Sequence, residues 1–405
     1  MVPTQASDDG LHWLALKLSA GIGTRIAARL ANAFGDPRAI FQAAPAELET
    51  HGVPPLIARQ LGKTSGSTSG FEEAQKELER ATQAGCEIVS YSDARYPELL
   101  RQIFDPPVVL YCRGNVELLS APAIAVVGAR KPTPYGLAVA GRLASDLTAR
   151  GLVIVSGLAR GVDTAAHNGA LEGSVVAASA EAASAGTGEG PTGRTIAVLG
   201  CGVDICYPSE NKRLKERIEK EGLVLSEFPM GTFAAPQNFP IRNRLISGLS
   251  LGVLVVEAAQ YSGSLITARL ALEQDREVFC VPGNITNKFS WGPNTLIKQG
   301  SKLVMEWRDV MDELPPAVRQ SLMVRMAEGD VTNGVAAASD FASGLSEVEK
   351  SLIGLLKVDE AHQIDAILEK LPEHSPSEIL SGLLELEIKG LVRQMPGKNY
   401  VRALL

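Results

Sequence analysis

Short hydrophobic runs alternate with amphipathic segments through the middle of the chain. The hydrophobic runs lie at residues 123–127, 152–155, 195–199, 223–225, 251–256 and 277–281, and helical windows lie at 212–221, 241–248 and 265–275. A run without a polar face is typical of a strand that is buried on both sides of a sheet. The alternation therefore predicts a doubly wound α/β fold, in which helices cover both faces of a parallel sheet of at least six strands.

Two of these hydrophobic runs end in a turn that combines glycine with arginine. Gly128 is followed by Arg130 after the first run, and Gly157 is followed by Arg160 after the second. Glycine lets the backbone approach a ligand closely, and a helix start offers free N–H groups and a positive dipole. An arginine beside the turn adds a forked cation that suits phosphate. One such turn would simply connect a strand to a helix, but the repeat predicts a site for a phosphate-bearing ligand at the strand ends.

The composition narrows the class of protein. The chain has 405 residues, of which 45% are hydrophobic, so it can bury a large core in two or three domains. No hydrophobic stretch is long enough to span a membrane, and the first residues lack the layout of a signal peptide. Five cysteines without a framework favour a reducing, cytoplasmic location. The net charge of −7 argues against a surface covered with cations, but it leaves room for a local cationic groove.

Metal and acid–base chemistry have little support in the sequence. The five histidines are scattered and fit no zinc spacing, so no metal or other cofactor is predicted. Cys201 and Cys206 flank a strand end and are expected to be small core residues. Asp163 and His167 lie one helical turn apart, a spacing that acid–base catalysis can use. A helix cap and a satisfied histidine are the simpler interpretation of this pair.

Residues 1–82 are expected to form a helical domain of the helix-hairpin-helix or SAM-like type. Glycine-containing hairpins at residues 21–23 and 52–54 each separate two helical segments. Such hairpins either present backbone N–H groups to a nucleic-acid phosphate or serve only for packing. Pro54 removes one donor from the second hairpin, which favours the packing role.

Two segments are expected to connect elements rather than to form them. Residues 173–193 are rich in Ala, Ser and Gly, and they predict a flexible insertion in a sheet domain that spans residues 83–314. The helix before this insertion is expected to end near Leu171. Residues 315–343 are expected to form a linker to a last domain.

Residues 344–405 predict a winged-helix domain. Three helical segments, at 347–356, 363–371 and 376–389, precede two short strands around Pro396-Gly397. The domain contains ten acidic and seven basic residues, and its third helix carries three glutamates. An acidic helix is repelled by the phosphates of a duplex, so protein contact or packing is favoured over duplex reading.

Several motifs of the central region resemble the DNA-processing protein A family (DprA, also called Smf). They include GARKPTPYG, VSGLARGVDTAAHNGAL, TIAVLGCGVDICYPSEN, FPIRNRLISGLS, VVEAAQYSGSLITARLALEQDREVFCVPGN and GPNTLIKQGSKLV, in this order. The resemblance covers residues 84–312, and the helical and winged-helix ends also fit many family members. It implies an extended Rossmann-like domain that binds single-stranded DNA without catalysis. It further implies a homodimer that loads the RecA recombinase onto incoming strands in natural transformation.

The resemblance also implies which residues contact DNA or phosphate. By motif these residues are Gly128, Arg130, Ser156, Gly157, Arg160, Gly161, Asp163, Lys212, Arg242, Asn243, Arg244, Ser262, Gly263, Ser264 and Thr267. Two positions depart from the family pattern. Ala129 replaces a serine in the first turn, and Ser209 stands where several relatives place a lysine, so that Lys212 becomes the candidate for this charge.

The residue types predict binding that does not depend on base sequence. Glycine turns and helix starts contact phosphates through the backbone, which carries no sequence information. Four arginines at or after strand ends are expected on one rim, namely Arg130, Arg160, Arg242 and Arg244. Few aromatic residues lie near the turns, so extensive base stacking is not predicted.

A nucleotide-processing enzyme of the phosphoribohydrolase type is the alternative hypothesis, because doubly wound folds commonly bind mononucleotides. Those enzymes carry a Pro-Gly-Gly-x-Gly-Thr turn, whereas Pro282-Gly283 continues here as Asn-Ile-Thr. Glu257 ends a strand and is a possible base, but without a partner it is expected to be a hydrogen-bonding residue of the rim.

Overall fold

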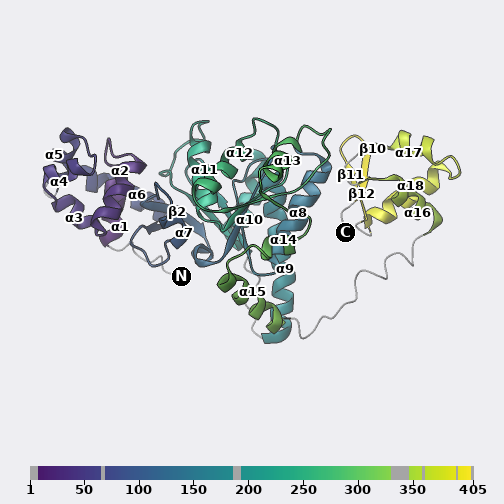
Figure 1. Cartoon of the computed structure of the whole chain (residues 1–405), viewed down its shortest axis with the longest axis horizontal. Coiled ribbons are helices and arrows are strands. Elements are labelled where there is room, and N and C mark those ends of the chain that lie inside the picture. Colours follow the sequence, from purple (N-terminus) through teal and green to yellow (C-terminus); the bar gives the residue numbers. More distant parts are fainter. Residues whose placement is uncertain are drawn as a thin grey trace.

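The computed structural model describes residues 8–64, 69–185, 193–329, 346–357, 361–388 and 391–402. Figure 1 shows an elongated molecule with a helical bundle at one end, a large sheet in the middle and a small helical unit at the other end. Within these ranges, no helix is both long enough and apolar enough to cross a lipid bilayer.

The central sheet has nine strands in the order β1-β2-β6-β5-β4-β3-β7-β8-β9. In chain order they are β1 (Glu87–Ser90), β2 (Val109–Gly114), β3 (Ala123–Val127), β4 (Val153–Ser156), β5 (Thr195–Val198), β6 (Leu223–Ser226), β7 (Gly252–Val255), β8 (Glu277–Cys280) and β9 (Lys302–Leu303). The strands from β6 to β9 pair in parallel, which confirms the predicted sheet. The chain adds β4, β5 and β6 on one side of β3 and then crosses to place β7 on the other side. The topological switch point therefore lies between β3 and β7.

Strands β1 and β2 extend the parallel sheet with antiparallel pairing. β2 pairs with β6, and β1 pairs with β2 at the edge of the sheet. The sequence prediction began the sheet at residue 123 and did not include these two strands.

Helices cover both faces of the sheet because side chains alternate along each strand. In β3, Ile124 and Val126 pack with α8 (Pro134–Thr148) and α9 (Val162–Ala185) on one face. Ala125 and Val127 belong to the opposite face, which is covered by α10 (Lys212–Glu221), α11 (Asn238–Gly248) and α12 (Gly263–Glu273). The remaining helices of the central region are α7 (Glu98–Arg101), α13 (Trp291–Lys298) and α14 (Trp307–Met311). All the β3 side chains of both faces are buried, as the unbroken hydrophobic run predicts.

Two segments expected to lack structure contain helix. Helix α9 does not end near Leu171 but continues to Ala185, into the segment predicted as an insertion. The rest of that insertion, residues 186–192, lies outside the described residues. Helix α15 (Pro316–Gly329) occupies the first half of the predicted linker, and residues 330–345 lie outside the described residues. Ala-rich segments without an amphipathic pattern still favour helix by propensity, and the periodicity criterion misses this contribution.

The N-terminal helices are α1 (Asp8–Leu18), α2 (Thr24–Phe34), α3 (Pro37–Gln42), α4 (Pro45–Thr50), α5 (Pro55–Thr64) and α6 (Ser69–Gln83). The two predicted hairpins join α1 to α2 and α4 to α5. Gly21 and Gly52 take positive φ angles of 82° and 79° in these turns, a conformation that favours glycine. Trp13 is fully buried and donates a hydrogen bond to Ser92 at 2.9 Å. The hydrophobic cluster around Trp13 is continuous with that of the sheet.

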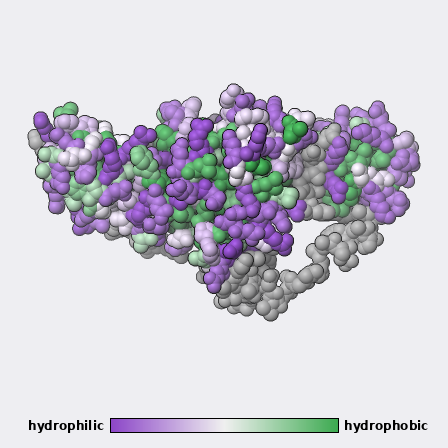
Figure 2. All heavy atoms as spheres, viewed as in Figure 1, coloured by the Kyte–Doolittle hydropathy of each residue, from purple (hydrophilic) through white to green (hydrophobic). Residues whose placement is uncertain are grey.

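The C-terminal unit is a winged helix, as predicted. Its helices are α16 (Glu347–Leu355), α17 (Ile364–Lys370) and α18 (Pro376–Ile388), and its sheet has the order β10 (His362–Gln363), β12 (Asn399–Arg402), β11 (Val392–Met395). Leu352, Ile367 and Leu383 belong to a hydrophobic cluster that is separate from those of the central sheet. Figure 2 shows that hydrophilic residues dominate the viewed face, with hydrophobic residues scattered over the central region and the winged helix.

Candidate nucleic-acid interface

A cavity of about 550 Å³ opens at the topological switch point. We call it the switch-point cavity and define it by the residues that line it. Nine of the fifteen predicted site residues are among these, namely Gly128, Arg130, Asp163, Arg242, Asn243, Ser262, Gly263, Ser264 and Thr267. They come from the end of β3 and from α9, α11 and α12, so segments up to 139 residues apart in the chain meet here because of the strand order.

Arg130 is the exposed cation of the switch-point cavity. Its guanidinium lies 5.5 Å from the centre of the Phe239 ring, a cation–π distance. The turn before it requires glycine, because a Cβ on Gly128 would lie 2.6 Å from Val162. Val162 is the first residue of α9, so the missing side chain lets the β3 turn pack directly on this helix start.

Arg242 and Asp163 order the second glycine turn from within. Arg242 is buried and donates to the Gly157 carbonyl oxygen at 3.3 Å. Asp163 Oδ2 accepts hydrogen bonds from the N–H groups of Gly157 at 3.1 Å and Ala159 at 3.2 Å. A Cβ on Gly157 would overlap the Arg242 guanidinium, so a side chain at this position would displace that arginine. Asp163 therefore braces the preceding loop instead of capping its own helix.

Burial raises the pKa of Asp163, while Arg242 and the two N–H donors act in the opposite direction. Arg242 and Asp163 therefore act on each other electrostatically within one buried cluster. Arg242 thus faces the switch-point cavity from a buried position, in contrast to the exposed Arg130.

The amino end of α12 supplies backbone donors to the same cavity. Ser262 accepts a hydrogen bond from the Ser264 N–H at 3.4 Å, and the two hydroxyl oxygens lie 2.6 Å apart. A Cβ on Gly263 would have no neighbour within 4 Å, so the helix start is open on this side. With eleven residues of helix behind it, this end offers N–H groups and a positive dipole to an anion.

Four predicted site residues lie beside the switch-point cavity without lining it. Gly157 and Arg160 border a smaller neighbouring cavity, where the Arg160 guanidinium is paired with Glu210. Gly161 has a φ of 78° and contacts the backbone of Ala129, a close approach that requires glycine. Ser156 is fully buried and donates to the Val126 carbonyl oxygen at 2.7 Å, so it joins β4 to β3.

Arg244 departs from the predicted rim, and Lys212 lies apart from the switch-point cavity. Arg244 is buried, forms an ion pair with Glu227 and lies 3.6 Å from Asp105, so it is a structural residue and not a rim cation. The reason is the helical periodicity of α11: Arg242 and Arg244 are two residues apart, which places them on different sides of the helix. Lys212 is exposed at the start of α10 and is not among the residues that line the switch-point cavity.

The candidate acid–base residues have structural contacts. Glu257 accepts hydrogen bonds from the Thr133 N–H at 2.8 Å and hydroxyl at 2.6 Å, and Thr133 in turn caps α8. His167 is fully buried, and its Nδ1 lies 2.8 Å from the Thr195 hydroxyl. That hydroxyl donates to the Ile154 carbonyl oxygen, so His167 Nδ1 is the donor, and its buried Nε2 has no hydrogen-bond partner among the residues that the structure describes. Burial lowers the pKa of His167 to about 3, and the positive Arg242 contributes.

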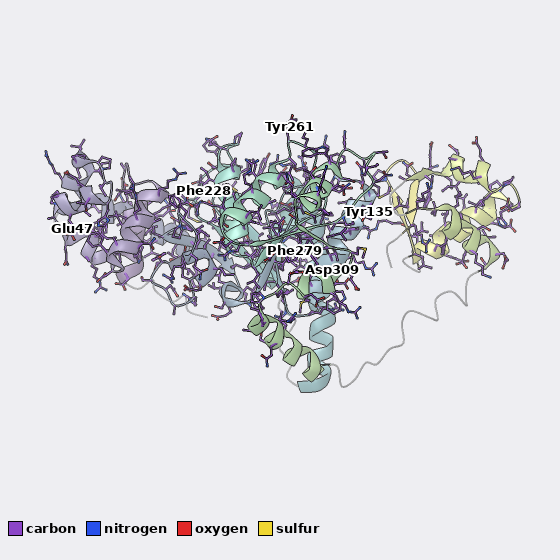
Figure 3. All side chains as sticks on the ribbon, viewed as in Figure 1. Glu47, Tyr135, Phe228, Tyr261, Phe279 and Asp309 are labelled. Atoms are coloured by element: carbon purple, nitrogen blue, oxygen red, sulfur yellow. The ribbon has the colours of Figure 1, made fainter. Side chains whose placement is uncertain are left out.

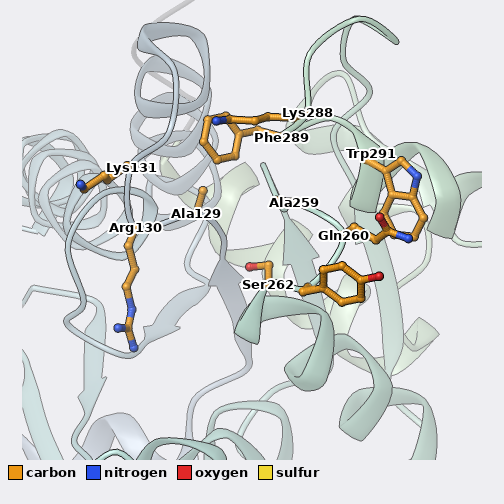
Figure 4. Close-up of a pocket in the computed structure, with 10 residues that line it drawn as sticks. Ala129, Arg130, Lys131, Ala259, Gln260, Ser262, Lys288, Phe289 and Trp291 are labelled. Carbon is orange, nitrogen blue, oxygen red and sulfur yellow. The ribbon is translucent and has the colours of Figure 1, made fainter.

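A second cavity of about 450 Å³ adjoins the first. We call it the aromatic cavity, because Tyr261, Phe289 and Trp291 line it together with Lys131 and Lys288 (Figure 4). None of these residues is among the predicted site residues, and Phe289 and Trp291 follow the end of β8 by several residues. The signal that would have found them is the cluster Lys288-Phe289-Ser290-Trp291, which combines a cation with two aromatic residues after the Pro282-Gly283 turn.

Comparison with known proteins shows to which family the chain belongs. A family model described as DNA recombination-mediator protein A matches residues 87–315, which are more than half of the chain. The chain belongs to the DNA recombination-mediator protein A family. A second model, described as the DprA winged helix domain, matches residues 336–398. The resemblance deduced from the motifs is thereby confirmed.

Relatives in this family cover most of the chain. Protein Smf of Synechocystis is 32% identical over 98% of this chain and 100% of its own length. DNA processing protein DprA of Bacillus subtilis is 39% identical over 68% of this chain and 88% of its own. The X-ray structure of DprA from Streptococcus pneumoniae superimposes with a TM-score of 0.62 at 34% identity, covering 76% of this chain and 98% of that one. The predicted fold class is therefore confirmed, and the protein is a member of a DNA-processing family.

Proposed function

We propose that this protein binds single-stranded DNA, without regard to base sequence, at the switch-point cavity. The observation that carries this proposal is the meeting of an exposed arginine, Arg130, with the open amino end of α12 in one cavity. Both groups recognise phosphate, and neither reads a base. The buried Arg242 adds positive potential behind them.

A single strand suits this arrangement better than a duplex. The donors are spread over turns that follow β3 and β7 and over α11, and a flexible backbone can bend to meet each of them. A stiff double helix cannot follow a concave cavity of this size without deformation. We therefore infer a preference for single strands.

Binding without turnover is favoured over the nucleotide-processing alternative. The acid–base candidates Glu257, Asp163 and His167 are buried and engaged in the fold, as described above. A neutral His167 with a pKa of about 3 is a poor base at neutral pH, and its ring is enclosed. Among the described residues, no group of three His, Cys, Asp or Glu side chains could hold a metal ion.

We further propose that the protein is a cytoplasmic homodimer that delivers its bound strand to the RecA recombinase. The support for this step is membership of the DNA recombination-mediator family. We assign strand binding to the domain at residues 83–314, which contains the switch-point cavity. RecA-driven strand exchange on a strand already coated by single-strand binding protein tests the delivery step. Light scattering of the purified protein measures its mass in solution and tests the homodimer.

The decisive experiment compares three ligands with the full-length protein. Labelled oligo-dT, a duplex of equal length and a mononucleotide are titrated by fluorescence anisotropy or calorimetry at physiological salt, and each mixture is examined for hydrolysis. We expect tight binding of oligo-dT, weak binding of the duplex and no change in any ligand. Equal affinity for the duplex would contradict the single-strand assignment, and hydrolysis of the mononucleotide would support the enzyme instead.

A further inference from the structure

The aromatic cavity contains two large side chains that the fold leaves in solvent. Tyr261 is 93% exposed and Trp291 is 44% exposed. Figure 3 shows Tyr261 at the outer edge of the central region, above α12 and α13. Exposed aromatic groups that flank a cavity are a common mark of a binding surface, because their hydrophobic surface is buried only when a ligand arrives.

Cations surround these rings. Arg130, Lys131 and Lys288 line the aromatic cavity, the Lys288 amine lies 5.2 Å from the centre of the Phe289 ring, and none of the described lining residues is acidic. Figure 4 shows Lys288 and Phe289 on one side of the opening and Trp291 on another. The combination of flat hydrophobic surfaces with positive charge fits a ligand that has flat rings and negative groups.

The aromatic residues are held in place by the backbone beneath them. The Ala258 N–H donates to the Phe289 carbonyl oxygen at 2.7 Å, and the Gly292 N–H donates to the Ala258 carbonyl oxygen at 2.8 Å. A Cβ on Gly292 would lie 2.6 Å from that same oxygen, so glycine permits the close approach. The end of β7 and the start of α13 are thus joined, which fixes Phe289 and Trp291 near Tyr261 before any ligand binds.

The two cavities share part of their walls. Arg130 and Ser262 line both, and in Figure 4 the Arg130 side chain extends away from Phe289 and Lys288. Its guanidinium lies over the Phe239 ring of the switch-point cavity. A polymer whose phosphates occupy the switch-point cavity therefore has its next units within reach of the aromatic rings.

We propose that the aromatic cavity is a base-stacking subsite for the single strand, with Tyr261 and Trp291 as the stacking surfaces and Lys131 and Lys288 on the flanking phosphates. This inference rests on the proposed function and adds a contact to the bases themselves. Stacking accepts every base, because each has a π face, so it keeps the binding independent of sequence. It also selects against a duplex, in which the base faces are covered by their neighbours.

The test measures the binding of two oligonucleotides of the same length, oligo-dT and a version in which the sugars carry no base. The variants are Tyr261→Ala and Trp291→Ala, and Phe104→Ala is the matched control, because Phe104 is 82% exposed but lies beside Arg25 of α2. We expect each site variant to weaken oligo-dT binding about 5- to 150-fold. Wild type and the site variants should bind the abasic strand with equal affinity. Phe104→Ala should leave the affinity for both oligonucleotides unchanged.

Tryptophan fluorescence gives a second readout on folded protein. Trp13 is fully buried and Trp307 is stacked under Arg150, so quenching on addition of oligo-dT should come from Trp291 and should disappear in Trp291→Phe. The subsite would be overturned if the two site variants lost as much affinity for the abasic strand as for oligo-dT. It would also be overturned if both site variants bound oligo-dT as tightly as wild type does. Quenching by a free mononucleotide at the same concentration would overturn it in favour of a nucleotide site. If wild type bound no oligonucleotide at all, the proposed function itself would fail. If Arg130→Ala lost binding while Tyr261→Ala and Trp291→Ala bound as wild type does, the proposed function would stand and the subsite would not.

Discussion

Residues that look alike in the sequence differ in role according to the side chain's surroundings. Four arginines were expected on one rim, namely Arg130, Arg160, Arg242 and Arg244, yet only Arg130 and Arg160 are exposed. Arg242 organises a glycine turn, and Arg244 neutralises the buried Glu227. A buried charge must be paired, so the local partner decides the role of each arginine.

Arg130→Ala should keep the fold and lose affinity for single strands. Because its guanidinium is exposed at the cavity, its removal leaves the core intact and loses only the exposed contact with the Phe239 ring, but it removes an ionic contact to the strand of about 1–3 kcal/mol. The slope of log affinity against log salt should fall by about 0.7 for oligo-dT. Arg308→Ala is the matched control, since Arg308 is also exposed but lies on α14, away from α11 and α12 in Figure 1. An unchanged affinity and salt slope in folded Arg130→Ala would show that the site lies elsewhere.

Arg244→Ala should unfold more easily, in contrast to Arg130→Ala. The substitution leaves Glu227 buried beside Lys17, whose amine is 4.0 Å away, and removal of one partner of a buried pair costs about 3–5 kcal/mol. Urea denaturation measures this loss in the free energy of unfolding. A variant as stable as wild type, with weakened DNA binding, would return Arg244 to the binding surface.

His167 should make the protein sensitive to acid. Its pKa is about 3 in the folded state and near 6.5 when exposed, so below pH 6.5 the unfolded chain binds a proton that the folded chain does not. Its contribution to stability is complete above pH 6.5 and declines by about 1 kcal/mol per pH unit as the pH falls toward 3. In His167→Asn, where an amide N–H can replace the Nδ1 donor, denaturation curves between pH 7 and pH 4 should depend less on pH. If the free energy of unfolding depended on pH equally in wild type and His167→Asn, a buried, neutral histidine would be contradicted.

At the scale of elements, the contact between α8 and α9 depends on glycine. Gly169 of α9 lies against the backbone of Gly141 in α8, and a Cβ there would overlap the Gly141 carbonyl oxygen. This close approach places the amino end of α9, with Asp163, against the turn that follows β3. The helix pair therefore connects core packing with the geometry of the switch-point cavity.

Gly169→Ala should destabilise the protein by about 1–3 kcal/mol, because the added methyl group forces the two helices apart. Gly141→Ala is the control on the facing helix, since its Cβ would lie 3.7 Å from the nearest atom, an ordinary contact. Alanine has the higher helix propensity, so this control should be neutral or slightly stabilising. Thermal unfolding compares the two variants. A Gly169→Ala variant as stable as wild type would mean that the helix contact tolerates a side chain at this position.

At the scale of the whole molecule, the winged helix is a unit with its own core. Its hydrophobic cluster is separate from those of the sheet, although Arg393, Met395, Val401 and Arg402 border a third cavity beside α8 and α9. None of these residues lines the switch-point cavity. The exposed Leu380 and Leu384 on α18 add hydrophobic surface where a duplex-reading helix would need cations.

Deletion of residues 344–405 should therefore leave oligo-dT binding largely intact. The removed domain is net acidic and contributes no lining residue to the switch-point cavity. Anisotropy titrations of the truncated and full-length proteins at equal salt measure the difference. A large loss of affinity in a truncation that stays folded by circular dichroism would assign the winged helix a direct part in strand binding.

The sequence by itself determined the parallel sheet, the helices around it, the glycine turns and the winged helix. These features follow from periodicity and from backbone conformation, which are local properties of the chain. Tertiary structure decided which side chains reach the ligand. Arg130 stayed exposed while Arg244 met Glu227, and Phe289 and Trp291 came beside Tyr261 only because the end of β7 bonds to the start of α13. The local cluster at residues 288–291 indicates which residue types are present, but their burial and their partners depend on segments far apart in the sequence.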